Sequence, residues 1–247
     1  MSSTSIVDSQ AKYVRTLRIR NSYVLEDSVL FQELEERVKP MLETGKSGEI
    51  MRIALDLDGV LADLHSVLLK KFSEVANRHI TIDMITSWHA ADKFKPGLSF
   101  TYYSAWEDYE PEQIKPCEPD IGSLVEQIRK TAPVDVVSGH GESSRQNIQR
   151  WLAIHRVRYE NLVLIGERIG KRSSKLSLTR DYNVFIDDNP ALAEKAPSTV
   201  LVLLYSQPWN QLIQRSAADD NVVRIRSLAE VPEHVKSRGL RSSSFNA

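Results

Sequence analysis

The sequence has a single cysteine, no long apolar run and almost no net charge, and each shortage excludes a class of protein. Cys117 is the only cysteine among 247 residues, so neither an intrachain disulfide nor a cluster of thiolate metal ligands can form. No apolar run approaches the roughly 20 residues that a membrane-spanning helix needs, and residues 1–4 are too polar to begin a secretory signal. We therefore expect a cytoplasmic protein without a membrane partner.

The charges nearly cancel, with 32 Lys and Arg against 33 Asp and Glu. No overall field attracts a phosphate backbone, so we expect no long nucleic acid as a partner. The basic residues between Lys12 and Arg20 are more typical of a solvated helix face than of a binding patch. The sequence leaves homodimerisation open.

The composition is that of a globular protein, with 41% hydrophobic and 26% charged residues. A chain of this length can hold one core domain with an insertion. Apolar residues at helical spacing predict an amphipathic helix at 28–42. The expected parts are an N-terminal extension (1–50), a core (51–62 and 119–235), an insertion (63–118) and a flexible tail (236–247).

Five short apolar runs alternate with helical patterns at 121–130 and 143–155. This alternation predicts the α/β class, with a Rossmann-like parallel sheet and helices on both faces. The aromatic-rich stretch 63–118 is longer than a crossover requires, so we expect a small helical cap inserted after the first strand. The runs expected to form buried strands are 53–55, 134–137, 162–165, 184–186 and 200–204.

Polar residues close three of these strands, at the edge where ligands bind in open parallel sheets. Asp56 and Asp58 lie two residues apart, and at extended spacing both point the same way. Such carboxylates repel each other unless they share a proton or a cation lies between them, and Mg²⁺ prefers oxygen ligands. Asp187 and Asp188 would reach the same site if their strand is a neighbour; alternatively, they cap the helix that Pro190 begins.

The run Asp56-Leu57-Asp58-Gly59-Val60 after an apolar strand resembles the first motif of the haloacid dehalogenase superfamily. Ser138, a lysine before the fourth strand and the pair Asp187-Asp188 resemble that superfamily's remaining motifs, in the same order, within residues 51–205. The resemblance implies a magnesium-dependent phosphohydrolase.

The resemblance also implies roles for the first motif. Asp56 would be the nucleophile that forms a phosphoaspartate, and Asp58 the general acid and then the general base. Asp56 and the backbone carbonyl of Asp58 would bind Mg²⁺. Ser138 would hold a phosphoryl oxygen, helped by the backbone amides of Gly139 and His140.

The remaining motifs supply positive charge and further metal ligands. Lys175, preferred to Lys171 because it is nearer the fourth strand, would offset the charge of the nucleophile and the phosphate. Asp187 and Asp188 would complete the magnesium shell, and we favour Asp188 as the direct ligand.

The run 58–63, the insertion after it and residues 205–210 resemble the 5'(3')-deoxyribonucleotidase family, which implies a nucleoside monophosphate as the substrate. Aromatic residues of a cap can stack on a base, although a small cap also needs such rings for its own core. The candidates for substrate contact are Trp88, Tyr102, Tyr103 and Trp106.

The sequence allows three other interpretations. Residues 166–173 resemble a phosphate-binding loop of nucleotide kinases, but the spacing between the glycines and the hydroxyl position are both wrong. A non-catalytic regulatory protein on this fold would have little use for crowded carboxylates. A sugar phosphate or another small phosphomonoester remains the alternative substrate.

Overall fold

The computed structural model describes residues 51–166, 175–213 and 221–244. The amphipathic helix expected at 28–42 lies outside these ranges, and so does Lys171. Among the described residues, no helix is both long and apolar enough to cross a membrane.

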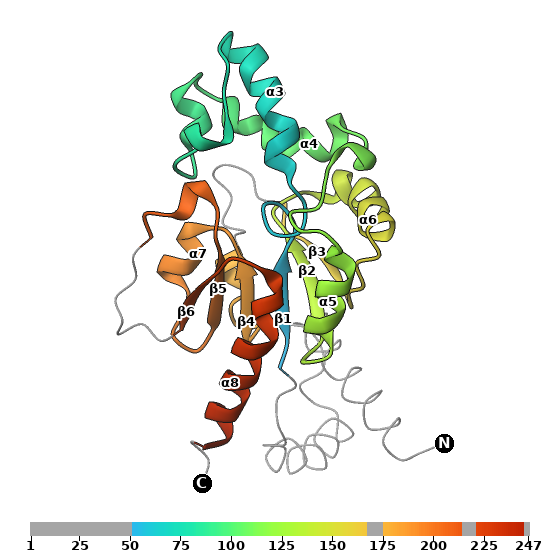
Figure 1. Cartoon of the computed structure of the whole chain (residues 1–247), viewed down its shortest axis with the longest axis vertical. Coiled ribbons are helices and arrows are strands. Elements are labelled where there is room, and N and C mark those ends of the chain that lie inside the picture. Colours follow the sequence, from blue (N-terminus) through green and yellow to red (C-terminus); the bar gives the residue numbers. More distant parts are fainter. Residues whose placement is uncertain (1–50, 167–174, 214–220, 245–247) are drawn as a thin grey trace, which may run out of the picture. The chain divides into compact units, whose positions relative to one another are not determined.

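The core is a six-stranded sheet in which every neighbouring pair is parallel, in the order β3-β2-β1-β4-β5-β6 (Figure 1). The predicted fold class is therefore confirmed. The sequence did not predict β6, because this strand is short, three of its four residues are only partly buried, and it includes Arg224. The strands are β1 (Ile53–Asp56), β2 (Val134–Ser138), β3 (Leu162–Leu164), β4 (Val184–Asp187), β5 (Leu201–Tyr205) and β6 (Val222–Ile225).

Side chains alternate between the two faces of the sheet, and a separate apolar cluster covers each face. Ile53 and Leu55 of β1 belong to the larger cluster, which includes buried residues of α5, α6 and α8. Ala54 belongs to the smaller cluster, which includes Leu192 of α7. The core helices are α5 (Ile121–Arg129), α6 (Arg145–Ile154), α7 (Pro190–Lys195) and α8 (Val231–Ser244).

The insertion after β1 is helical, as expected, and lies beyond the carboxyl ends of the strands (Figure 1). Its helices are α3 (Leu64–Ala76) and α4 (Thr101–Asp108). Asp63 caps α3 by accepting a hydrogen bond from the Ser66 amide. The chain enters and leaves the cap through two linkers that pair with each other, since Ala62 bridges Pro116 and the Cys117 amide donates to the Leu61 carbonyl at 2.8 Å.

Short 3₁₀ turns join many of the elements. Ser227 and Glu230 form a capping box at the last of these turns, and α8 follows directly. Val231 and Val235 anchor the start of α8 in the core, and the helix continues to Ser244. It therefore covers most of the segment 236–247, which was expected to be a flexible tail. The 3₁₀ turns are Ile82–Met84, Ala90–Lys93, Leu98–Phe100, Pro111–Gln113, Glu142–Ser144, Lys175–Leu178, Pro208–Asn210 and Leu228–Glu230.

Candidate active site

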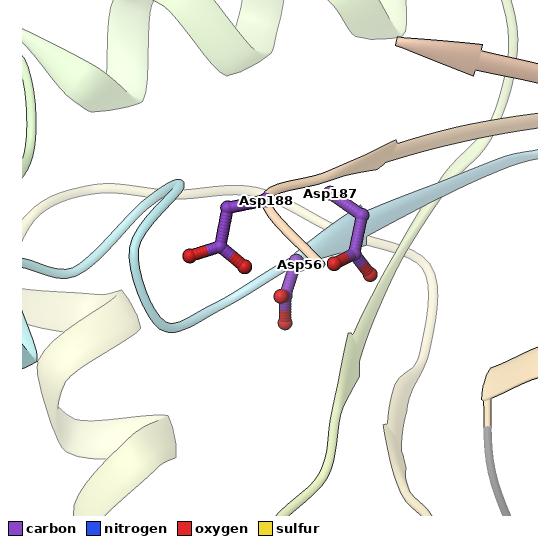
Figure 2. A group of neighbouring side chains, drawn as sticks. All are labelled: Asp56, Asp187 and Asp188. Carbon is purple, nitrogen blue, oxygen red and sulfur yellow. The ribbon is translucent and has the colours of Figure 1, made fainter. Parts of the chain in front are cut away.

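Three buried carboxylates meet where β1 and β4 end. Strand β1 pairs with β4 in the register Leu55 to Ile186, so the residues that follow lie side by side. Asp56, Asp187 and Asp188 each offer an oxygen within 4.8 Å of the others, and their exposed fractions are 4%, 1% and 1% (Figure 2). The two acidic pairs therefore follow neighbouring strands, which is the condition under which the sequence expected them to reach one site.

Lys175 is the cation that the structure places in this cluster. Its Nζ lies 2.5 Å from Asp56 Oδ2 and 2.8 Å from Asp187 Oδ2, and the residue is only 7% exposed. Burial alone would lower the pKa of Lys175, but Asp187 and Asp56 outweigh it and raise that pKa above its ordinary value. The lysine is therefore held in its charged form.

Among the described residues, the one ammonium group of Lys175 does not balance the three carboxylates of the cluster. Burial, followed by repulsion from Asp187, raises the pKa of Asp56 well above its ordinary value. Burial and Asp187 raise the pKa of Asp188 in the same way. Both pKa values are raised because keeping these carboxylates ionised together costs free energy. A further cation would lower that cost.

The acidic cluster fits a hard divalent cation. Asp188 Oδ1 is buried and has no hydrogen-bond partner among the described residues, whereas Asp187 accepts hydrogen bonds from Lys175 and from the Asn189 amide. Two oxygens bound to one Mg²⁺ at about 2.1 Å lie at most about 4.2 Å apart, so the three carboxylates need only a small contraction to share an ion. The unpaired oxygen makes Asp188 the better candidate for a direct ligand.

Asp58 lies beside the cluster and is held from two sides. Trp106 Nε1, from cap helix α4, donates to Asp58 Oδ1 at 2.8 Å, and His140 Nε2 lies 2.9 Å from Asp58 Oδ2. Burial would raise the pKa of Asp58, but the charge and hydrogen bond of His140 outweigh it and lower that pKa. Burial opposes a charged imidazole, yet Asp58 raises the pKa of His140 above its ordinary value. Both shifts favour an ion pair between the two groups.

Ser138 ends β2 at the same edge of the sheet. Its neighbour Val137 pairs with Asp56, and Ser138 itself is fully buried. Its hydroxyl accepts a weak hydrogen bond, 3.3 Å long, from the His140 amide. Gly139 lies between these two residues, so the loop that was expected to bind phosphate also carries the histidine that holds Asp58.

The aromatic residues of the cap have different environments. Trp106 is fully buried, with its indole nitrogen bonded to Asp58, so its ring packs in the protein interior. Tyr102 packs against His65 and Phe72, with ring centroids 4.9 and 5.6 Å apart. Trp88 and Tyr103 are each 42% exposed. Trp106 thus contacts an acid of the site through its ring nitrogen.

The structure adds residues that the sequence did not identify as part of the site. Trp209 Nε1 donates to Asp188 Oδ2 at 3.1 Å, and Gln207 Nε2 donates to the Gly59 carbonyl at 2.6 Å. His65 of α3 stacks on Trp209, with ring centroids 3.8 Å apart. In the sequence, residues 205–210 show only a family resemblance, and that resemblance assigns no role to these side chains.

Position 59 requires a glycine, both for its backbone conformation and for the close approach of Asp188. Its φ is +78°, in the left-handed region where a side chain is strained. A Cβ atom at this position would lie 2.1 Å from Asp188 Oδ2. The glycine therefore lets the loop after β1 approach the acid that follows β4.

No known family's sequence profile matches this chain, and no curated protein sequence matches it. Solved structures do match. One is a hydrolase of the haloacid dehalogenase-like family from Streptococcus pneumoniae, with 17% identity, a TM-score of 0.52, and coverage of 75% of this chain and 98% of that one. Another, described as a predicted phosphoglycolate phosphatase from Haemophilus somnus, has 14% identity, a TM-score of 0.50, and coverage of 76% and 99%. At these identities the likeness establishes the fold alone.

Proposed function

We propose that this protein is a magnesium-dependent phosphomonoester hydrolase that acts through a phosphoaspartate on Asp56. The observation that carries the proposal is the buried cluster of Asp56, Asp187, Asp188 and Lys175, with Asp58 beside it. Few arrangements other than a site for a cation and a phosphate explain three crowded, buried acids around one lysine.

The reaction has two halves. In the first, a carboxylate oxygen of Asp56 bonds to phosphorus, the bond from phosphorus to the leaving oxygen breaks, and protonated Asp58 gives its proton to that oxygen. In the second, the carboxylate of Asp58 takes a proton from a water molecule whose oxygen attacks the same phosphorus. The bond from phosphorus to Asp56 then breaks, which releases inorganic phosphate and restores both acids.

The other residues bind and orient the phosphate. Asp56, Asp188 and the Asp58 carbonyl would hold Mg²⁺, which supplies positive charge to the phosphoryl oxygens. Lys175 adds a second positive charge on the side of Asp187. Ser138, with the amides of its loop, would donate hydrogen bonds to the phosphate.

The lowered pKa of Asp58 is compatible with its role as a general acid. Without substrate the carboxyl group is ionised, because His140 stabilises its charge. A phosphate dianion bound nearby would raise that pKa, since a neighbouring negative charge favours the protonated form. The substrate would thereby promote protonation of the group that must donate to its leaving oxygen.

For the substrate we propose a nucleoside monophosphate, on the strength of the resemblance of the first motif and of residues 205–210 to deoxyribonucleotidases. A sugar phosphate is the second candidate. The observation that favours it is the full burial of Trp106, which removes one ring from those that could stack on a base.

The first test is hydrolysis of p-nitrophenyl phosphate with and without Mg²⁺. Asp56→Asn keeps the shape of the side chain and removes the nucleophile, so we expect kcat to fall by about 10³-fold or more. Asp83→Asn, at an exposed carboxylate of the cap, is the matched control and should keep full activity. Acid quenching of a reaction with ³²P-labelled substrate should trap a labelled chain in the wild type and none in Asp56→Asn. A metal-independent activity that survives in Asp56→Asn would refute the proposal.

The second test compares kcat/KM across deoxynucleoside monophosphates, glucose 6-phosphate and phosphoglycolate. A preference of tenfold or more for the nucleotides corresponds to about 1.4 kcal/mol of differential transition-state binding. If the nucleotides have no advantage, the nucleotidase assignment fails while the phosphatase assignment stands.

A further inference from the structure

The short segment after β5, residues 206–210, folds back over the acidic cluster. It comes from the strand next to β4, yet it contacts both acid-bearing loops. Gln207 donates to the carbonyl of Gly59 in the loop after β1, and Trp209 donates to the carboxylate of Asp188 after β4. We call residues 206–210 the bracing loop.

Asn210 fixes the bracing loop to the chain after β4. Its side chain is fully buried, and Nδ2 donates to the Asp188 carbonyl at 2.9 Å and to the Tyr205 carbonyl at 2.8 Å. Its Oδ1 accepts from Arg224 Nη1 at 2.8 Å and from the Gln207 amide at 3.1 Å. Every polar atom of this amide is therefore used, which fixes its orientation.

Arg224 of β6 holds the other side of the bracing loop. Its Nη2 donates to the Asn210 carbonyl at 2.9 Å and to the Ile213 carbonyl at 3.1 Å. Edge strand β6, which the sequence did not predict, is thus connected to Asp188 of the cluster through Arg224 and Asn210.

The bond from Trp209 distinguishes the two oxygens of Asp188. Oδ2 accepts the indole N–H, whereas Oδ1 is buried and has no partner among the described residues. An oxygen that already accepts a hydrogen bond is less available to an ion. The indole therefore leaves Oδ1 as the oxygen directed to a metal.

We propose that Gln207, Trp209 and Asn210 are positioning residues for the metal site: they fix the loops after β1 and β4 and select the oxygen of Asp188 that binds the ion. This inference rests on the proposed function, because it takes the acidic cluster to be a divalent cation site. We assign none of the three a contact with the reacting phosphate. Partners that orient metal ligands typically change metal affinity by about 10–100-fold when they are mutated.

The test is direct metal binding to the full chain, with Mn²⁺ as the probe and electron paramagnetic resonance of the free ion as the readout. Asn210→Asp keeps the shape and replaces the donor by an acceptor, so the Mn²⁺ dissociation constant should rise by about 10-fold or more. Trp209→Phe keeps an aromatic ring but removes the N–H together with part of the indole, so it should weaken binding in the same direction. Added Mg²⁺ should restore part of the lost phosphatase activity.

Asn221 offers a matched control. It is also a buried asparagine whose Nδ2 donates to two backbone carbonyls, those of Pro197 and Val200, but these carbonyls belong to the turn before β5. Asn221→Asp should weaken the fold as Asn210→Asp does, and leave Mn²⁺ affinity within about twofold of the wild type. Thermal unfolding in EDTA measures the loss of stability in each variant.

The outcomes separate the inference from the proposed function. If the wild type binds Mn²⁺ and both Asn210→Asp and Trp209→Phe bind it equally well, the positioning role is wrong and the metal site stands. If the wild type binds no Mn²⁺, the metal site itself is wrong, and the positioning role with it. If Asn210→Asp does not fold, Trp209→Phe decides the question, because it leaves the buried amide network intact.

Discussion

Both ends of the parallel sheet bury carboxylates, and the two ends treat them differently. At the amino end, Asp135 is 2% exposed, and its oxygens are paired with the Asn161 amide and side chain, the Tyr182 hydroxyl and the Arg52 guanidinium. At the carboxyl end, Asp188 is 1% exposed and one of its oxygens has no partner among the described residues. A buried acid that the protein satisfies stabilises the fold, whereas an unsatisfied one destabilises it and is available to a ligand.

The largest expected difference between the ends is in stability without metal. Asp135→Asn leaves Arg52 and the other donors with a weaker acceptor, so the free energy of unfolding should fall by about 3 kcal/mol. Asp188→Asn removes a charge that repels Asp187 and should leave the free energy of unfolding unchanged or higher. Urea unfolding of both variants in EDTA gives the comparison.

Adding Mg²⁺ should make the wild type more stable than Asp188→Asn, which is the reverse of their order in EDTA. A ligand at 100 times its dissociation constant stabilises a protein by about 2.7 kcal/mol, and wild type and Asp135→Asn should both gain it. Asp188→Asn should gain little. If Asp135→Asn and Asp188→Asn lost the same free energy of unfolding in EDTA, the proposed difference between the two ends of the sheet would be wrong.

The next largest effect is a pH dependence at the carboxyl end. Burial lowers the pKa of His65 to about 4, although Asp58 and Asp63 oppose the shift. Between about pH 6.5 and 4 the unfolded chain binds a proton at this residue and the folded chain does not, so the free energy of unfolding should fall by about 2–3 kcal/mol from pH 7 to 4.5. Below pH 4 both states are protonated and the loss should level off.

His65→Phe keeps a ring against Trp209 and removes the titrating group, so its free energy of unfolding should vary less over this interval. His79→Asn, at an exposed histidine of the cap, is the control. Urea unfolding at pH 7 and 4.5 measures the difference. If the free energy of unfolding fell equally between pH 7 and 4.5 in the wild type and in His65→Phe, His65 would not contribute to the pH dependence.

The smallest effect should come from Gly59→Ala. A left-handed backbone is about 1–2 kcal/mol less favourable for alanine, and the new methyl group would press on Asp188 Oδ2. The free energy of unfolding should fall by about 2 kcal/mol, and Mg²⁺ should bind less tightly. Gly141→Ala is a suitable control, because its φ is negative and, among the described residues, a Cβ there meets only Ser143 Oγ at 3.9 Å.

Much of the fold, and the acids of the site, could be predicted because local patterns determine them. Each buried strand is a short apolar run, and the acids Asp56, Asp187 and Asp188 directly follow such runs. Parallel strands then bring their carboxyl ends to one edge. Strand β6 was not predicted, because an edge strand that is only partly buried has a weak apolar pattern in the sequence.

The bracing loop could not be predicted, because its contacts join residues far apart in the sequence. Gln207 meets Gly59 across 148 positions, and Asn210 meets Arg224 only because β6 lies beside β5. Trp106 illustrates a second limit. The sequence suggested an aromatic surface for a substrate, whereas the structure uses the N–H of that ring on Asp58. Residue type alone does not show which atoms of a side chain are used.

The central place of β1 in the sheet has a consequence for folding. It is the first described strand in the chain, yet its two neighbours are β2 and β4, which follow only after the whole cap and after β3. During synthesis, an apolar strand with both edges unpaired must wait for partners more than 75 positions away. Such non-local pairing slows folding and exposes the strand to association with other chains. We therefore expect the growing chain to depend on chaperones until β4 has been made.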